Sequence, residues 1–576
     1  MNIKILCIFI LLLFSAHSQQ NNTTSAIITY PPIKPLIQFH YYLTAAYMLF
    51  IVVLGLFMAD MVVIKNKPTQ FRDILFNKRL LPPTKNKLLS WFEYNSLAEM
   101  SLGETLLALM YLLVNFSWFA WGYGYAAING WNALSARGFG WMSNMNAAFL
   151  MLPVTRNSVW YKIYGISFER AIKYHKLLSE WNLITVFLHT VCFTWTYYQT
   201  DSLHWLFVWG WNINNYSILP GVIGGVLYLA GSIVSLNYFR RNFWNFFLIS
   251  HIVLNCAATF LVILHAIWFQ TVPFLGVAFG LYFVDLILRA FVGYGKTASL
   301  VGVEYISKCD IVKLSIHKPG FTYEPGQYIY LWIDAVGMSE AKPFTIACHS
   351  KSDERSTVTI YIKDVKSDYK DSTTLFDPWT HRLAVWAEKV QNGQASAKNC
   401  FVRMEGPYGS ISHDYDRYDT VVLVAGGIGI TAMYSLFISL LDKYRNDPTH
   451  SEKKVYLIWT KRKRELWNLF PEILKYEDLD NRASIESGLQ CNIRLYVTEN
   501  VEDEAAMVKS GVDVIRGRPD FKSVLQNILD ERISKSPFVS VCGCGANQMI
   551  ADLEEACWDQ SGSDAKIHFH REIFEF

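Results

Sequence analysis

Four histidines with a repeated spacing lie in two long apolar stretches of the chain. His175 and His189 stand in "KYHKLLSEWNLITVFLHT" (173–190), and His251 and His265 stand in "FFLISHIVLNCAATFLVILHA" (246–266). In each stretch the two histidines are separated by about four helical turns, so they project from one face and lie about 21 Å apart along the axis. An ionisable side chain inside a membrane is costly and usually functional. One such histidine can equally be a packing residue that hydrogen-bonds a neighbouring helix, but two identical pairs indicate two metal sites.

Two imidazoles at each of two depths suit haem better than other metal centres. A planar haem is held between two helices by one histidine on each side, whereas zinc requires four ligands that converge on one point. Both helices are expected to begin on the same side of the membrane. His175 therefore pairs with His251, and His189 pairs with His265. We expect two stacked bis-histidine haems with these four residues as axial iron ligands.

The elements that position these histidines must be membrane helices. The chain has 576 residues, of which 52% are hydrophobic and 15% aromatic, and the apolar excess is concentrated in residues 1–295. Seven stretches are long enough to span a bilayer. They lie at about 41–63, 101–122, 138–155, 170–197, 218–237, 243–267 and 273–293. The first half of the chain is therefore predicted to be a membrane α-helical bundle of about seven spans.

The charged loops predict the orientation of this bundle. Basic residues cluster in the 64–90 loop, between 156 and 173, and at Arg240 and Arg241, which places these segments in the cytosol. The 198–217 loop lacks Lys and Arg and carries a glycosylation sequon at Asn215, as expected of an exterior loop. We therefore expect an exterior amino terminus and a cytosolic carboxyl terminus. A plasma-membrane location is expected, with the vacuole or another endomembrane as the alternative.

The first residues resemble a secretory signal. Residues 1–18 combine Lys4, a short apolar core and the small residues Ala16 and Ser18, with an uncleaved anchor as the alternative. Residues 19–40 then form a short exterior tail with sequons at Asn21 and Asn22. None of the ten cysteines falls on an exterior loop, so the second half of the chain is expected in the reducing cytosol. The net charge of +3 is small and gives no indication of nucleic-acid binding.

The second half of the chain divides into two domains. Short alternating runs at 309–333, 356–365 and 398–410 predict an antiparallel β-barrel over 297–415. Strands at 420–426, 454–460, 492–498 and 538–543 then alternate with helical segments, which predicts an α/β domain over 418–576. The membrane domain is assigned to 41–295.

Several longer motifs resemble one known family. "ARGFGWMSNMNAAFLMLPVTRNS" (136–158) and the Arg pair in "SLNYFRRNFWNFFLISH" (235–251) are similar to segments of the fungal ferric reductase and NADPH oxidase superfamily. The resemblance runs from about residue 100 to the end, with the motifs in the family's order. It implies a bis-haem membrane domain, an FAD-binding barrel and an NADPH-binding α/β domain. Arg240 or Arg241 would neutralise haem propionates, with a plain topological role as the alternative.

The barrel carries two segments that match the family's flavin motifs. "KPFTIA" (342–347) resembles a His-Pro-Phe-Ser/Thr motif, with Lys342 in place of the usual His. The resemblance implies that Phe344 faces the isoalloxazine ring and that Thr345 bonds near its reactive nitrogen. "GPYGS" (406–410) resembles the pyrophosphate loop, with an inter-domain turn as the alternative. The implied FAD residues are Pro343, Phe344, Thr345, Ile346, Gly406, Pro407, Tyr408 and Gly409.

The α/β domain carries motifs that resemble the family's nucleotide site. "VLVAGGIGITAM" (422–433) is a strand, a glycine-rich turn and a helix start, although Ala432 stands where the family usually has Pro. Lys461 and Arg462 resemble the family's basic group that binds the 2′-phosphate of NADPH, with a solvated charge run as the alternative. Cys544 replaces the usual Pro after Cys-Gly. The implied NADPH residues are Gly426, Gly427, Gly429, Thr431, Lys461, Arg462, Cys542 and Gly543, and Phe576 would cover the flavin.

The resemblance implies a complete transmembrane electron-transfer route. Cytosolic NADPH would reduce FAD, and electrons would pass through two b-type haems to an exterior acceptor, with Cys542 and the four histidines as the catalytic set. The expected acceptor is ferric iron in a chelate, siderophore or haem, or cupric ion, in support of iron uptake. A superoxide-generating oxidase that reduces dioxygen is the first alternative. A non-catalytic haem-binding member of the family is the second.

Overall fold

The computed structural model describes most of the chain from residue 100 onward. The described residues are 100, 102–156, 168–208, 217–266, 272–294, 298–347, 357–364, 379–398, 400–409, 415, 418–445, 453–461, 469–470, 473, 490–498, 514–531, 538–562 and 566–572. The predicted signal, exterior tail, first span and sequons fall outside them, as do Arg462 and Phe576. The chain forms two compact units, and the boundary between Leu286 and Ile287 falls within a helix.

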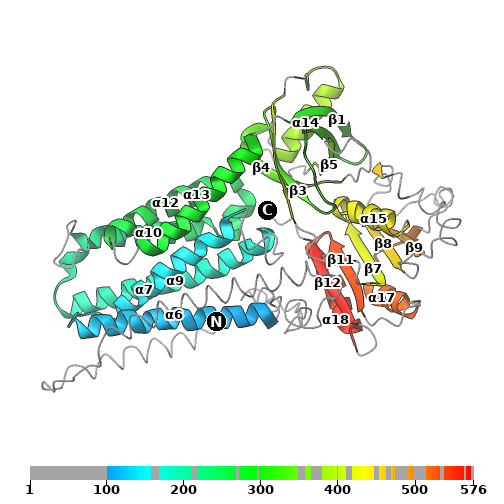
Figure 1. Ribbon diagram of the computed structural model, residues 1–576. Coiled ribbons are helices and arrows are strands. Elements are labelled where there is room, and N and C mark those ends of the chain that lie inside the picture. Colours follow the sequence, from blue (N-terminus) through cyan, green and yellow to red (C-terminus); the bar gives the residue numbers. More distant parts are fainter. Residues whose placement is uncertain are drawn as a thin grey trace. The chain divides into compact units, whose positions relative to one another are not determined.

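The first unit is a bundle of helices (Figure 1). Its elements are α6 (Leu102–Ile128), α7 (Leu134–Met151), η3 (Leu152–Val154), α9 (Phe168–Gln199), η4 (Leu203–Phe207), α10 (Ile218–Val234), α11 (Asn237–Asn242), α12 (Trp244–His265) and α13 (Val272–Tyr294). Six of the seven predicted spans therefore coincide with helices, and the remaining one, 41–63, lies outside the described residues.

Three helices in the described part of the chain are long and apolar enough to cross a membrane. They cover Leu102–Ile128, Ala171–Gln199 and Trp244–His265, and α10 is a shorter apolar helix. Many large apolar side chains on these helices are exposed, as expected of surfaces that face lipid rather than water. The chain therefore contains a multi-pass membrane region.

Small residues let neighbouring helices of the bundle approach closely. On α10, a Cβ at Gly224 would lie 3.2 Å from Val262 Cγ2 and 3.3 Å from the Ala258 carbonyl of α12. On α7, a Cβ at Gly138 would lie 2.9 Å from the Phe119 carbonyl of α6. Close packing of this kind is the main source of helix association in a membrane, where burial of apolar surface contributes little. α10 thus lies directly against α12, and α7 against α6 (Figure 1).

The second unit begins with six antiparallel strands. β1 (Ser299–Ile306), β2 (Ile311–His317) and β5 (Thr357–Lys363) form one sheet in the order β1-β2-β5, and β3 (Tyr328–Ile333), β4 (Gly337–Thr345) and β6 (Val402–Tyr408) form another in the order β4-β3-β6. Their inward side chains share one apolar core, which α14 (Trp379–Gln391) covers through Trp379 and Leu383. β1, β4 and α14 are additions to the elements that the sequence patterns predicted.

A six-stranded parallel sheet completes the second unit. Its order is β10-β9-β8-β7-β11-β12, formed by β7 (Thr420–Gly426), β8 (Lys454–Lys461), β9 (Gln490–Val497), β10 (Val514–Arg516), β11 (Phe538–Cys544) and β12 (Lys566–Glu572). α15 (Ile430–Arg445) packs on one face, and α17 (Phe521–Asp530) and α18 (Asn547–Gln560) pack on the other (Figure 1). The sequence predicted this layered arrangement because strands that alternate with helices form a parallel sheet covered on both faces.

Candidate functional site

The four membrane histidines form two close pairs within the first unit. His175 and His189 lie on α9, and His251 and His265 lie on α12. The ring centroids of His175 and His251 are 6.3 Å apart with an interplanar angle of 77°. Those of His189 and His265 are 6.2 Å apart with an angle of 81°. The two pairs have nearly the same geometry.

Each imidazole is oriented by a hydrogen bond at its Nδ1 atom. Three of the acceptors are backbone carbonyls: Leu150 for His175 at 2.9 Å, Ala136 for His189 at 2.7 Å, and Ser217 for His265 at 2.7 Å. A carbonyl can only accept, so Nδ1 carries the proton and Nε2 keeps a free lone pair. A partner of this kind is the usual way in which a metal-binding histidine is held in its tautomer. For His251 the nearest partner is the Ser235 hydroxyl, at 2.8 Å.

The spacing of the two pairs fits a bis-imidazole metal site. Metal–imidazole nitrogen distances are about 2.0–2.1 Å, and each ring centre lies about 1 Å beyond its nitrogen, so two rings on opposite sides of one ion have centroids about 6 Å apart. Both observed separations agree with this value. The residues present therefore fit two haems, each held by one histidine of α9 and one of α12.

Two glycines make room for the His189–His265 pair. A Cβ at Gly140 on α7 would lie 3.0 Å from His189 Cε1 and Nδ1. A Cβ at Gly221 on α10 would lie 2.5 Å from His265 Nδ1, closer than real Cβ contacts allow. Gly221 comes one helical turn after Ser217, whose carbonyl accepts from His265, and Gly140 follows Ala136 in the same way. Each helix thus offers a carbonyl and then a gap to the imidazole beside it.

Buried polar contacts fix α9 between its two histidines. Asn146 of α7 accepts from Tyr111 Oη of α6 at 2.5 Å and donates to Thr185 Oγ1 of α9 at 3.4 Å. Ser143 donates to Asn182 at 3.0 Å, one turn away. Polar groups inside a membrane find such partners because water is absent. These contacts set the rotation of α9 and hence the direction of its histidines.

The two flavin motifs meet on strand β3. Thr345 of β4 and Tyr408 of β6 are both paired with Tyr328, one on each side. Phe344 is paired with Ile329, and its ring lies 5.5 Å from that of Trp379. Pro343 and Lys342 occupy the next positions of β4, and the Ile346 amide donates to the Gln327 carbonyl at 3.0 Å. The register thus brings the 342–346 segment and the Gly406–Gly409 loop to adjoining positions.

The Gly406–Gly409 loop depends on glycine at both ends. Gly406 has a φ of 139° and Gly409 a φ of 89°, which side-chain-bearing residues rarely adopt. A Cβ at Gly409 would also lie 3.2 Å from the Tyr328 ring. The end of β6 therefore runs close against β3, and glycine allows this approach.

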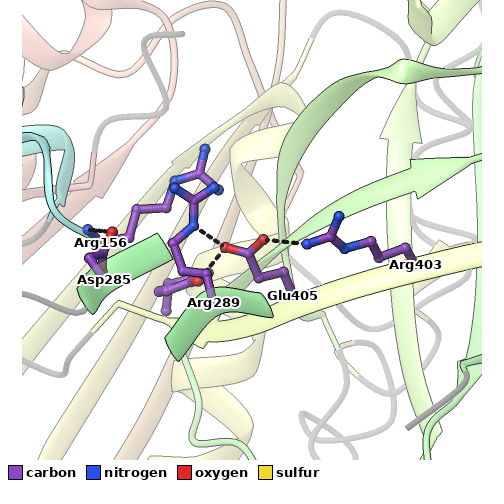
Figure 2. A network of polar contacts seen from close by, with 6 residues as sticks. Arg156, Asp285, Arg289, Arg403 and Glu405 are labelled. Atoms are coloured by element: carbon purple, nitrogen blue, oxygen red, sulfur yellow. Dashed lines mark hydrogen bonds and ion pairs between the residues drawn. The ribbon is translucent and has the colours of Figure 1, made fainter. Parts of the chain in front are cut away.

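A buried carboxylate directly precedes this loop. Glu405 accepts from Arg289 Nε at 2.9 Å and from Tyr408 Oη at 2.5 Å, and it lies 3.6 Å from Arg403 Nη2. Figure 2 shows the two guanidinium groups on either side of this carboxylate. It also shows the contact of Asp285 on α13, which accepts from the Arg156 backbone amide at 3.2 Å. The sequence motifs did not point to Glu405 or Arg289. The only available signal was an acidic residue immediately before Gly-Pro-Tyr-Gly.

The glycine-rich turn of the α/β domain lies at the carboxyl edge of the sheet. It joins β7 to α15 through η6 (Gly427–Gly429). A Cβ at Gly429 would lie 2.5 Å from the Cys544 carbonyl, and one at Gly426 would lie 2.8 Å from Met549 Sδ. Thr431 Oγ1 donates to the Ile428 carbonyl at 3.1 Å. The close approach of the turn to β11 therefore requires these glycines.

Cys542 and Gly543 lie on β11 next to this turn. β11 pairs with β7, and Cys542 is opposite Leu423 and Gly543 opposite Val424. Burial raises the pKa of the Cys542 thiol well above its ordinary value, and nearby Glu572 raises it further. Burial likewise raises the pKa of Cys544 to about 12. Both thiols are therefore neutral at physiological pH, which suits packing against a nicotinamide better than nucleophilic attack.

Lys461 is the last residue of β8 and is only 3% exposed. Its ammonium group lies 5.5 Å from the Trp459 ring centre, and Trp459 Nε1 donates to the Gly427 carbonyl at 3.0 Å. Burial of this kind does not fit the solvated charge run that the sequence left open. The side chain instead lies beside the tryptophan that holds the glycine-rich turn.

Three family models match successive parts of the chain. "Ferric reductase like transmembrane component" matches residues 139–263, "FAD-binding domain" matches 296–412, and "Ferric reductase NAD binding domain" matches 418–558. His175, His189 and His251 fall within the first range, and His265 lies two residues beyond it; the flavin motifs and the glycine-rich turn fall within the second and third ranges.

Curated relatives fall into two named groups. "Respiratory burst oxidase homolog protein B" of Arabidopsis thaliana is 25% identical over 78% of this chain and 61% of its own length. "Ferric reduction oxidase 4" of the same organism is 29% identical over 62% of this chain and 48% of its own. A superoxide-generating NADPH oxidase heavy chain of Dictyostelium discoideum is 24% identical over 75% of this chain and 67% of its own. The chain thus spans about half to two thirds of the length of these relatives.

The fold, the three matched domains and the relatives agree with the family that the sequence motifs predicted. The chain carries a ferric reductase-like transmembrane region followed by FAD- and NAD-binding domains, and by these three domains it belongs to the ferric reductase and NADPH oxidase superfamily.

Proposed function

We propose that the chain carries electrons from cytosolic NADPH across a membrane to ferric iron on the far side. The observation that carries this proposal is the pair of matched imidazole sites, with ring separations of 6.3 and 6.2 Å, in a chain that also has flavin and nucleotide domains. When bound, FAD accepts a hydride and releases single electrons, and the haems pass these electrons on.

The chain's own residues would have distinct parts in this reaction. The glycine-rich turn and the Gly406–Gly409 loop would bind the two pyrophosphates through backbone amides. Cys542 and Gly543 would pack at the nicotinamide, and Thr345 would bond the flavin ring. The four histidines would hold the haems at two depths, about 21 Å apart along the helices. Lys461, together with Arg462 outside the described residues, would select NADPH by its 2′-phosphate.

The proposed orientation follows the basic loops. The amino terminus would be exterior, the flavin and nucleotide domains cytosolic, and the membrane the plasma membrane. The domain limits proposed are 41–295, 297–415 and 418–576, preceded by a signal at 1–18. Substitution Asn215→Gln should abolish the glycan at that sequon, and an unchanged endoglycosidase-sensitive mass would contradict an exterior 198–217 loop.

The acceptor is tested by direct measurement on the purified full-length protein. NADPH-driven reduction of a ferric chelate should continue undiminished when superoxide dismutase is added. Complete inhibition by the dismutase would instead favour the second candidate, a superoxide-generating NADPH oxidase. The named relatives include oxidases of that kind, so this candidate has a specific observation in its favour. Siderophores, haem and cupric ion complete the acceptor panel.

The electron route is tested by His189→Ala. This variant should lose the absorbance of one haem and the reduction of exterior acceptors, while NADPH still bleaches the flavin. The exposed His204 of η4 offers a matched histidine control, and His204→Ala should behave as the parent chain. Normal acceptor reduction by His189→Ala would refute the two-haem route. Absence of any NADPH-dependent haem reduction in the parent chain would indicate a non-catalytic haem-binding protein.

A further inference from the structure

One of the four membrane histidines has a different kind of hydrogen-bond partner. His175, His189 and His265 each bond a backbone carbonyl, which no side-chain substitution removes. His251 instead has the side-chain hydroxyl of Ser235 at 2.8 Å from its Nδ1 atom. Ser235 directly follows α10, one helical turn after Gly231.

The neighbouring hydrogen bonds decide the direction of this contact. Ser235 Oγ donates its own proton to the Gly231 carbonyl at 2.6 Å, so the hydroxyl oxygen is left to accept from the imidazole. The Asn255 amide nitrogen is 3.2 Å from the same Nδ1 but donates to the His251 carbonyl at 2.7 Å. An amide N–H cannot accept a proton. When Nε2 binds a haem iron, Nδ1 carries the proton, and of these two side chains only the Ser235 hydroxyl can then accept it.

The local packing holds this cluster in place. A Cβ at Gly231 would lie 2.7 Å from Asn255 Nδ2, so glycine is required for Asn255 to reach its position beside His251. Ser235 and Asn255 thus both lie beside one ring nitrogen of His251, whereas the other three histidines bond a backbone carbonyl there.

We propose that Ser235 is a positioning residue for the His175–His251 site and tunes the potential of the haem at that site alone. A hydrogen bond from the distal nitrogen of an axial imidazole makes the ligand a better electron donor, which stabilises the ferric state and lowers the potential. Removal of the hydroxyl weakens this effect at one site. The proposal rests on the proposed haem binding and adds a residue that acts on one of the two haems.

The same helix supplies a matched control. Ser217, the residue before α10, is the hydrogen-bond partner of His265, as Ser235 is of His251. Ser217 accepts through its backbone carbonyl, 2.7 Å from His265 Nδ1, and not through its hydroxyl. Ser217→Ala therefore keeps its hydrogen bond to the ligand, and Ser235→Ala loses it. Ser235→Thr retains the hydroxyl and serves as the conservative rescue.

The experiment is a potentiometric titration of the haem absorbance in the purified full-length protein, with haem content measured on the same samples. In Ser235→Ala, one of the two titrating components should shift to a higher potential while the other stays in place. Ser217→Ala and Ser235→Thr should reproduce the parent curve. Loss of one haem in Ser235→Ala, with both kept in Ser217→Ala, also supports the positioning role.

Other results would overturn the proposal. An unchanged curve, a joint shift of both components, a shift to lower potential, or an equal effect of Ser217→Ala would each show that the hydroxyl has no separate role. Absence of haem from the parent chain would instead refute the proposed function, so the two failures are distinguishable.

Discussion

At the scale of single residues, glycines determine where the imidazoles can lie. Gly221 and Gly225 are one turn apart on α10 and differ sharply in their surroundings. A Cβ at Gly221 would meet His265 Nδ1 at 2.5 Å, whereas a Cβ at Gly225 would meet no atom within 4 Å. The pair separates a specific effect on the histidine from a general effect of helix substitution.

We predict that Gly221→Ala halves the haem content, because the added methyl displaces His265 from its position. Overpacking of this kind costs about 1–3 kcal/mol. The measurement is the haem-to-protein ratio of the purified chain, with Gly225→Ala as the control that retains the parent ratio. Equal haem content in the two variants would show that His265 can move without loss of a site.

At the scale of elements, one arrangement of helices occurs twice in the first unit. α7 supports α9 and α10 supports α12, each through a carbonyl followed by a glycine one turn later. In the second unit, β3 brings the two flavin segments together, and β11 brings Cys544 to the glycine-rich turn. Neighbouring strands or helices thus carry the parts of each site, and their register decides which residues meet.

Gly429→Ala tests the register of the glycine-rich turn against β11. Its Cβ would lie 2.5 Å from the Cys544 carbonyl, a backbone atom that cannot move aside without displacing the strand. We expect the KM for NADPH to rise at least tenfold, which corresponds to about 1.4 kcal/mol. Dithionite should still reduce the haems fully.

The control for this variant is Gly562→Ala, because a Cβ there would meet no atom within 4 Å. It should keep the parent KM. If dithionite produced less reduced haem in Gly429→Ala than in the parent chain, the variant would be generally misfolded rather than impaired in nucleotide binding.

At the scale of the whole molecule, the second unit contains several buried thiols that stay protonated in the folded chain. Burial raises the pKa of Cys542, Cys544 and Cys557, and also that of the Tyr415 phenol. In the unfolded chain a thiol ionises near pH 8.5. The folded chain therefore binds more protons than the unfolded chain above this pH, and its stability is full below pH 8 and falls as the pH rises.

We predict that the thermal unfolding midpoint of the second unit decreases as the pH is raised from 7.5 to 10. This decrease should be smaller in Cys557→Ala. For each thiol whose pKa is raised by folding, the free energy of unfolding decreases by up to about 1.4 kcal/mol per pH unit above the pKa of the unfolded chain. Tryptophan fluorescence of the full-length chain in detergent measures the midpoint. The same pH dependence in both chains would show that Cys557 ionises as freely when folded as when unfolded.

Much of the fold followed from local sequence patterns. Apolar length predicted the membrane helices, and β7, β8, β9 and β11 coincide with the predicted strands, because these patterns reflect burial by neighbouring elements in any fold. β10 and the polar β12 were not predicted. β1, β4 and α14 were not predicted. β4 contains Pro343 and polar residues, and α14 has a mixed pattern, so their burial depends on partners distant in the chain.

The sequence alone determined the residues that can do chemistry: four histidines at a repeated spacing, and flavin and nucleotide motifs in a set order. Spacing along a helix is a local property, so the pairing of depths could be predicted without a structure. The tertiary structure decided which groups from other elements contact these residues. The carbonyls and the Ser235 hydroxyl at Nδ1, the glycine gaps, the buried Glu405 and the burial of Lys461 all join residues from separate elements. Such contacts depend on how helices and strands pack, and no local pattern encodes them.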